Sequence, residues 1–519
     1  MIYFFTIANY CRENKRSMFL FLLLFHIVIS VTLFSIANTE YLSSLHNGEG
    51  LWNFTRDSTY YHKEVLNLVT YIEKSQWFAW WYSYLNHSHL RVASLIYWIT
   101  GYHSPIVFEI VNCVVWATSL LLIFRVSELL FPDDIKLPLI VSIFFLQPSI
   151  LISSTQLLKD PIYILGFCFM CYGFTIFAKQ NSKWKWVFIL QIGIILVVLM
   201  RDYVSIILLV FLILFSVIVY FKEKTFLTPL LVLIIPLILL EFFSVNRFIS
   251  TDKLQMERSN LMKQIQASVA IDEQSQVSVT IEEQPQASVT IEEQPQVSVT
   301  IEEQPQVYLT TRQEKNKART IAIQEKIKSD NIAIKEKIKS NTVAIQFPTQ
   351  SYITSQVAIL EVLNNISDGI NTIRYGFRKD NSYAGSRIDP NKKYQSFTEL
   401  VMYFPRALQI GFLSPFPSNW LNKGSQVGTI GYLLIGLETI IWYFILLGFI
   451  YITYKNPSVI KPFSAVFLIS ITLILLLSYV VPNIGAIYRM RQSYMIPFYL
   501  FGAHGLTLMI SNFTKKQHK

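Results

Sequence analysis

Ten stretches of the chain are apolar enough to cross a membrane as helices, and polar segments separate them. A helix needs about 20 mostly apolar residues to span the hydrocarbon core. No small-residue cleavage site follows the first stretch, so we expect it to be a span and not a cleaved signal peptide. The pattern predicts an all-α polytopic membrane protein with about ten transmembrane helices. They lie near residues 17–37, 105–124, 137–154, 161–178, 186–200, 203–221, 226–244, 427–453, 463–481 and 494–511.

The charges between these stretches predict how the helices are oriented. Arg12, Lys15 and Arg16 precede the first span, and an excess of Lys and Arg marks cytoplasmic segments. Alternation of the spans then assigns the basic residues of every second loop to the cytoplasm, together with the tail residues Lys515 and Lys516. We therefore expect both termini to be cytoplasmic.

Two long segments are then predicted outside. Residues 38–104 are rich in Trp and Tyr, which indicates amphipathic helices that lie in the membrane interface. The second segment, 245–426, contains a polar insert of different composition. The predicted division is an N-terminal membrane module (1–250), a low-complexity outer insert (251–345), an outer amphipathic segment (346–426) and a C-terminal membrane module (427–519).

The insert is built from short tandem repeats. Decapeptides such as VSVTIEEQPQ fill 267–306, and two copies of an eleven-residue unit beginning IAI follow at 321–342. Units this short and this few are a weak basis for a stable solenoid. Two interpretations stay open, a mobile spacer and a partner-binding or surface-displayed element.

Composition excludes several other classes of protein. Only 15% of the residues are charged, against about 25% in an average soluble protein, which excludes an ordinary cytoplasmic enzyme and a disordered chain. Four cysteines in apolar settings are too few for a secreted disulfide scaffold. The net charge of +10 fits basic cytoplasmic loops, so we expect no nucleic-acid partner.

Four basic residues break the positive-inside pattern, because they are predicted at the outer ends of spans. They are Lys159, Arg201, Arg489 and Arg491. A charge at the bilayer centre costs about 2.5–3.5 kcal/mol on insertion scales, so charges at span ends call for a reason. Asp160 and Asp202 lie beside two of these cations, and the first outer loop adds Asp57, Tyr60 and His62 on the same side.

Because these residues share the outer side, we expect them to line one outward-facing cavity at headgroup depth. Arginine forks bind phosphate oxygens bidentately, and a carboxylate can take the proton of a hydroxyl. Such a cavity suits a substrate that carries a lipid phosphate and a reacting hydroxyl. The alternative is that some of these charges pair with one another or with lipid headgroups.

The order of these features resembles a known family. The segments that carry the resemblance are DSTYYHKEV (57–65), IYWITGYHSPIVFEIVN (96–112), SSTQLLKDPIYIL (153–165), VLMRDYVSIIL (198–208), YFPRALQIGFLSPFPSNW (403–420) and NIGAIYRMRQSYMIPF (483–498). In this order they resemble the C-type (GT-C) superfamily of membrane glycosyltransferases, in particular the bacterial relatives of protein-mannosyl and aminoarabinose transferases in surface-polysaccharide assembly. The resemblance covers about residues 38–250 and 370–511.

The resemblance implies roles by position. Asp57 matches the Asp of the first outer loop that acts as catalytic base or positions the acceptor, and Asp160 matches an acidic residue that helps to bind a divalent metal or the substrate. Tyr60 and His62 are candidate substrate-binding residues beside Asp57. The basic residues that hold the donor phosphate correspond to Lys159, Arg201, Arg489 and Arg491.

One departure from the family bears on cofactors. Asp57 is followed by Ser58 where some branches carry Glu. We therefore expect no required cofactor, and a divalent metal ion held by Asp57 and Asp160 stays an open alternative.

The resulting hypothesis is a glycosyltransferase of the bacterial cytoplasmic (inner) membrane. It would move a sugar, with inversion, from a polyprenyl-phosphate donor to a lipid-linked or surface glycan acceptor on the outer face. Two rival hypotheses stay open: a polysaccharide polymerase or ligase, and a non-catalytic lipid-glycan flippase or transporter. A non-catalytic scaffold that displays the repeats is a further alternative.

Overall fold

The computed structural model describes residues 2–83, 87–179, 184–201, 203–223, 232, 238, 350–380, 385–421 and 428–517. The chain divides into two compact units, Met1–Ser259 with Asn364–Lys519, and Asn260–Leu363. The repeat insert predicted at 251–345 lies outside the described residues, so both of its interpretations stay predictions.

The regular elements of the described residues are helices, accompanied by two isolated β-bridges, His46–Trp52 and Arg387–Asn483. In chain order they are α1 (Ile2–Glu13), α2 (Lys15–Ile36), η1 (Ser43–Leu45), η2 (Asn53–Thr55), α3 (Arg56–Glu73), α4 (Trp77–Tyr82), α5 (Ser88–Thr100), α6 (Pro105–Leu130), α7 (Leu137–Ser142), α8 (Pro148–Ser154), α9 (Asp160–Lys179), α10 (Lys185–Met200), α11 (Val204–Glu223), α14 (Gln350–Asp380), α15 (Phe397–Met402), α16 (Phe404–Leu413), η3 (Pro417–Asn419), α17 (Gly428–Lys455), α18 (Pro457–Ile460), η4 (Lys461–Phe463), α19 (Ser464–Val480) and α20 (Ile484–Gln517).

Seven helical segments of the described residues are long and apolar enough to cross a membrane. They correspond to α2, α6, α9, α11, α17, the run from α18 to α19, and α20. The helix α10 is apolar but has only 16 residues, and the predicted span 226–244 lies almost entirely outside the described residues. The helical, multi-pass class is therefore confirmed, whereas the count of ten spans stays a prediction.

The prediction of one continuous span at 137–154 is wrong, because two short helices, α7 and α8, occupy it with a turn between them. Proline lacks a backbone N–H and disfavours helical backbone at the residue before it; Gln147, before Pro148, accordingly has a ψ of 133°. Polar groups freed in an apolar setting need partners. The Ser149 N–H and hydroxyl donate to the Glu438 carboxylate over 2.9 and 2.6 Å.

The helix α9 is largely buried and packs against α6, α10 and α20. Its contact with α10 is close: a Cβ added to Gly193 would lie 2.7 Å from the carbonyl oxygen of Gly166. Small residues allow membrane helices to approach in this way. The tight antiparallel pair brings Asp160, at the start of α9, beside Arg201, just after the end of α10.

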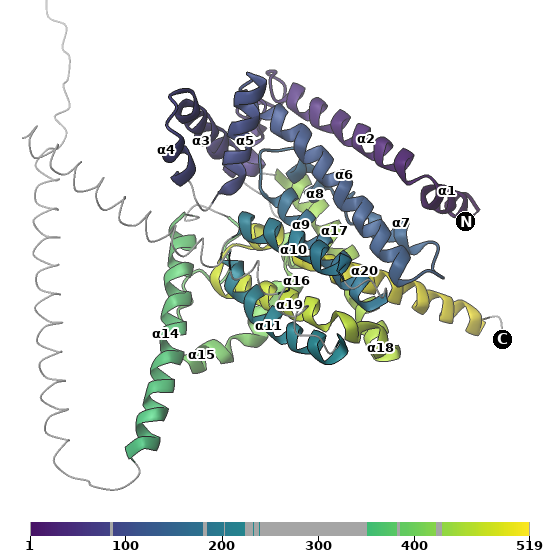
Figure 1. The fold of residues 1–519 in the computed structure, drawn as a ribbon, viewed down its shortest axis with the longest axis vertical. Helices are drawn as coiled ribbons and strands as arrows, with labels where there is room; N and C mark the ends of the chain where they lie inside the picture. The colour runs from purple at the N-terminus through teal and green to yellow at the C-terminus, as the bar shows by residue number, and fades with distance from the viewer. Residues whose placement is uncertain are drawn as a thin grey trace, which may run out of the picture. The chain divides into compact units, whose positions relative to one another are not determined.

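Both termini lie at one end of the bundle, and the helices α3, α4 and α5 lie towards the other (Figure 1). At the end with the termini, Arg12 and Lys15 pair with Glu128 at 3.4 and 3.3 Å. This arrangement agrees with a common side for the N-terminal basic residues and the C-terminus. Which side of a membrane it is stays a prediction.

Residues 364–413, from α14 to α16, are bound to the bundle by hydrogen bonds of buried side chains. The buried guanidinium of Arg374 donates to the carbonyl oxygens of Tyr479 and Asp389 at 2.8 and 2.7 Å. Arg406 in turn pairs with the Asp389 carboxylate at 3.0 Å. These contacts hold the residues that precede α15 against the end of α19.

Candidate functional site

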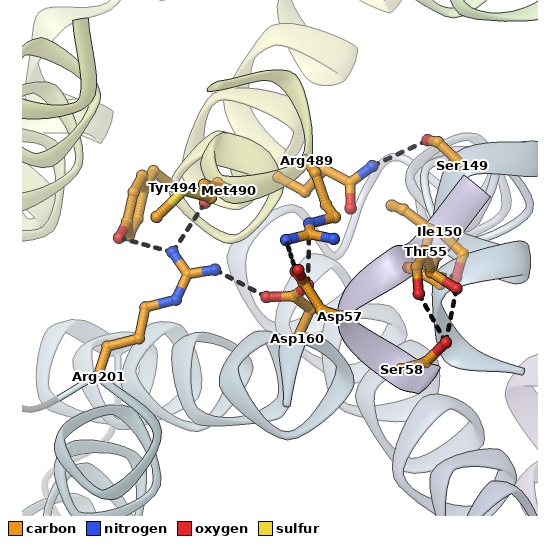
Figure 2. Close-up of polar contacts among 12 residues, drawn as sticks. Thr55, Asp57, Ser58, Ser149, Ile150, Asp160, Arg201, Arg489, Met490 and Tyr494 are labelled. Atoms are coloured by element: carbon orange, nitrogen blue, oxygen red, sulfur yellow. Dashed lines mark hydrogen bonds and ion pairs between the residues drawn. The ribbon is translucent and has the colours of Figure 1, made fainter. Parts of the chain in front are cut away.

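The candidate site lies where the ends of four helices meet. Asp57 is in the first turn of α3, Asp160 is the first residue of α9, Arg201 follows α10, and Arg489 is near the start of α20. Figure 2 shows Arg489 directed at both carboxylates, with Arg201 on the far side of Asp160. Charged side chains from four distant parts of the sequence thus form one network.

Hydrogen bonds fix the position of Asp57 relative to Asp160. The hydroxyl of Ser58 donates to the Thr55 carbonyl at 2.6 Å, closing the turn that starts α3. Gln156, in the loop before α9, accepts the backbone N–H of Trp52 at 3.0 Å. Gln156 is four residues before Asp160, and Trp52 is five residues before Asp57. This hydrogen bond therefore joins the segments that lead into α9 and α3.

Asp160 is a buried carboxylate with both oxygens in contact with arginines. Its Oδ1 accepts from Nη2 of Arg201 at 2.7 Å, and its Oδ2 lies 3.5 Å from Nε of Arg489. The side chains of Arg201 and Asp160 are only 3% and 7% exposed. Arg201 also lies over the ring of Tyr163, at 4.3 Å from the ring centroid. A buried charge needs such compensation, so we infer that Asp160 and Arg201 position their neighbours.

Asp57 and Arg489 form the accessible part of the network. Arg489 donates through Nη2 to Oδ2 of Asp57 at 2.5 Å. The side chain of Asp57 remains 45% exposed and that of Arg489 31% exposed. Within the described residues no hydrogen bond reaches Oδ1 of Asp57 or Nη1 of Arg489. A ligand can therefore approach one free carboxylate oxygen and one free guanidinium nitrogen at the same place.

Lys159 is a cation of the site without a direct partner among the described residues. Its ammonium makes no hydrogen bond or ion pair with the residues that the structure describes. Burial, followed by the charge of Arg201, lowers the Lys159 pKa to about 8, although Asp160 and Asp57 oppose this shift. Lys159, Arg201 and Arg489 carry three positive charges against the two negative charges of Asp57 and Asp160. The cluster therefore has a net charge of +1 while Lys159 is protonated.

Tyr61 belongs to the site although sequence reasoning selected its neighbour Tyr60. Tyr61 follows Asp57 by one helical turn, and its pKa is raised by burial and then by the charges of Asp57 and Asp160. Its ring packs against the rings of His87 and His89. Tyr60 is 50% exposed. Tyr60 and Tyr61 lie three and four residues after Asp57, and both spacings share a helix face, so the sequence could not tell which of the two is buried.

The structure places two other predicted residues away from this network. Nδ1 of His62 lies 3.1 Å from the Tyr97 hydroxyl, and burial lowers the pKa of His62. Arg491 is fully buried and donates to the carbonyl oxygens of Gly411 and Ser414 at the end of α16. Residues two apart on a helix do not face the same way, which explains why Arg489 and Arg491 separate. Asp202 lies outside the described residues.

The pair Asp57 and Asp160 does not fit a divalent metal ion in this arrangement. The guanidinium of Arg489 contacts both carboxylates and takes the place that a shared cation would need. The described residues contain no group of three or more His, Cys, Asp or Glu side chains that could hold a metal ion. A metal at these residues stays an untested alternative, and no step below depends on one.

Comparison of the chain with protein families, with curated proteins and with solved structures gives no match. The interpretation of the site therefore depends on its own geometry.

Substitution by asparagine should destabilise the protein much more at Asp160 than at Asp57. Asp160→Asn leaves the buried Arg201 without its counter-charge, and removing one partner of a buried pair costs about 3–5 kcal/mol. Asp57→Asn breaks a half-exposed pair, for which about 1 kcal/mol or less is expected. Unfolding of both variants in the same detergent would measure this difference, and equal losses of stability would contradict the division of roles.

Proposed function

We propose that this protein is an integral membrane glycosyltransferase. It would transfer a sugar from a polyprenyl-phosphate donor to a hydroxyl of a lipid-linked or surface glycan acceptor. The observation that carries this proposal is the accessible Asp57–Arg489 pair, together with the electrostatic interaction of Lys159, the residue before Asp160, with both members of the pair. A carboxylate with a free oxygen suits proton removal, and the two cations suit a phosphate.

In the proposed reaction one bond forms and one bond breaks at the anomeric carbon of the sugar. The acceptor oxygen forms a bond to the anomeric carbon while the bond from that carbon to the phosphate oxygen breaks on the opposite face, which inverts the configuration. Asp57 takes the hydroxyl proton, and the electron pair of the broken bond leaves with the lipid phosphate. Arg489 and Lys159 stabilise the charge that develops there, as preorganised cations do in other transfer reactions.

The charge of the site matches this donor class before and after transfer. A sugar phosphodiester carries one negative charge, which balances the net +1 of the cluster described above. After transfer Asp57 is neutral, so the cluster carries +2, and the released phosphate monoester approaches −2 because its second pKa is about 6. A diphosphate-linked donor would leave one negative charge without a counterpart in this cluster. The balance therefore favours a monophosphate carrier.

The remaining residues of the network act through these groups. Asp160, paired with Arg201, contacts Arg489 from the buried side, and on this proposal the Tyr61 hydroxyl would donate to a sugar or phosphate oxygen. On this proposal the site faces the outer side of the bacterial inner membrane, with both termini in the cytoplasm. This agrees with α3, the helix that carries Asp57, and the termini lying at different ends of the bundle (Figure 1).

The rival functions use fewer features of the site. A polymerase or ligase that moves an oligosaccharide between lipid carriers would use the same cations, and a flippase or transporter would need no base. The free carboxylate oxygen of Asp57 favours transfer chemistry over transport. The charge balance favours a monophosphate donor over the diphosphate that joining two lipid-linked glycans would involve.

Asp57→Asn should abolish transfer without loss of protein. Removal of a general base typically lowers a rate by about 10²–10⁴-fold. The measurement is the surface glycan of cells that carry the variant as their only copy, with the protein level in the membrane determined in parallel. Glu64→Gln is the matched control, because it removes the same charge from the same helix two turns away and should retain the glycan. Normal glycan with Asp57→Asn would contradict the proposed function.

Binding of a lipid phosphate should weaken as the pH rises through about 8. The reason is that Lys159, with its lowered pKa, loses its charge in this range, and linkage predicts a decline of up to about tenfold per pH unit. The measurement is the Kd of dodecyl phosphate in detergent micelles between about pH 7 and about pH 9, above the second pKa of the phosphate. Lys159→Arg keeps the charge and should remove the decline; an unchanged decline in this variant would exclude Lys159 as its source.

A further inference from the structure

One guanidinium serves two partners in the proposed reaction. Nη2 of Arg489 donates to Asp57 in the structure, yet the proposed function, on which this inference rests, needs Arg489 for the donor phosphate and Asp57 for the acceptor proton. A guanidinium beside a carboxylate favours its ionised form and so opposes proton uptake. Asp57 is therefore restrained as a base while Arg489 holds it.

We propose that Arg489 is a switch operated by the donor. The donor phosphate replaces Asp57 on the outer nitrogens of Arg489, and the released Asp57 then accepts the proton of the acceptor hydroxyl. The exchange breaks one hydrogen bond from Nη2 to a carboxylate and forms one to a phosphate oxygen, with no covalent change. The site becomes active for proton transfer only after the donor is bound.

The geometry allows this exchange without disturbing the buried part of the network. Arg489 and Asp57 are both partly exposed, whereas Asp160 and Arg201 are buried. On the Asp160 side Arg489 is held through Nε at 3.5 Å, a contact that is not a hydrogen bond. Nη1 and Nη2 both lie on the outer part of the guanidinium, where a phosphate can bind bidentately. Asp160, with Arg201 as its second partner, can retain Arg489 while Asp57 leaves.

The switch predicts a result that a simple catalytic role for Asp57 does not. If the phosphate competes with Asp57 for Arg489, removal of the competitor should tighten binding of a lipid phosphate while transfer is lost. We expect Asp57→Asn to lower the Kd of dodecyl phosphate about fivefold, which corresponds to about 1 kcal/mol. Glu64→Gln removes an equal charge from the same helix and should change the Kd by less than about twofold.

The experiment is a double-mutant cycle on the full chain in detergent micelles. The Kd of dodecyl phosphate is measured for the wild type, Asp57→Asn, Arg489→Gln and the double variant. The gain from Asp57→Asn should vanish when Arg489 is absent. Asp57→Ser serves as a second removal of the carboxylate if the Asn variant does not fold. Inorganic phosphate is the second probe, and weaker binding of it would assign the site to a phosphate carried by a lipid.

The outcomes separate the switch from the function on which it rests. Tighter binding by Asp57→Asn, dependent on Arg489, supports the switch. An unchanged or weaker affinity, or the same gain in Glu64→Gln, overturns the switch and leaves the proposed function intact. Wild-type protein that binds no dodecyl phosphate overturns both. Equal affinity for inorganic phosphate would retain the exchange at Arg489 but contradict a lipid-linked donor.

Discussion

The contact of one guanidinium with two carboxylates organises this site. Arg489 enters from α20 and meets Asp57 from α3 and Asp160 from α9. The three helices are far apart in the sequence, so their mutual position depends on packing elsewhere in the bundle. The packing of α20 on α9 and the hydrogen bond from Trp52, before α3, to Gln156, before α9, supply that position. Without Arg489, Asp57 would lose its ion-pair partner and Asp160 would keep only Arg201.

Asp160 and Asp57 differ in burial, and we infer different roles for them from this difference. Asp160 lies in the protein interior, where Arg201 compensates it and where exchange of partners would be costly. Asp57 lies at the surface of the same network, where solvent screens the ion pair and its partner can be exchanged at small cost. A single arginine thus contacts one buried carboxylate and one exposed carboxylate. The proposed transfer chemistry and the proposed switch both depend on this difference.

Features that are local in the sequence were predicted well. The spans follow from length and hydropathy alone, and most predicted stretches coincide with helices of the structure. The exception at 137–154 shows where hydropathy fails, because Pro148 interrupts the helix without making the segment less apolar. The charges at one end of the bundle were also identified from the sequence, since a charge at the end of a span is conspicuous.

Pairing was not predictable from the sequence, because it depends on tertiary contacts. Arg201 pairs with Asp160 of another helix, although its sequence neighbour was Asp202. The sequence predicts that Arg489 and Arg491 bind the same phosphate, yet only Arg489 faces the carboxylates. Helix periodicity alone would have separated these two, because residues two apart do not share a helix face. The sequence therefore predicted which residues carry charge at the site, and the structure shows which of them act together.

A structure of the protein with dodecyl phosphate bound, determined by cryo-electron microscopy, would test the central claim most directly. We predict the phosphate within hydrogen-bonding distance of the outer nitrogens of Arg489 and of the Lys159 ammonium. Asp57 should be released from Arg489, and the Asp160–Arg201 pair should be unchanged. A phosphate bound elsewhere, with the Asp57–Arg489 pair intact, would contradict the account.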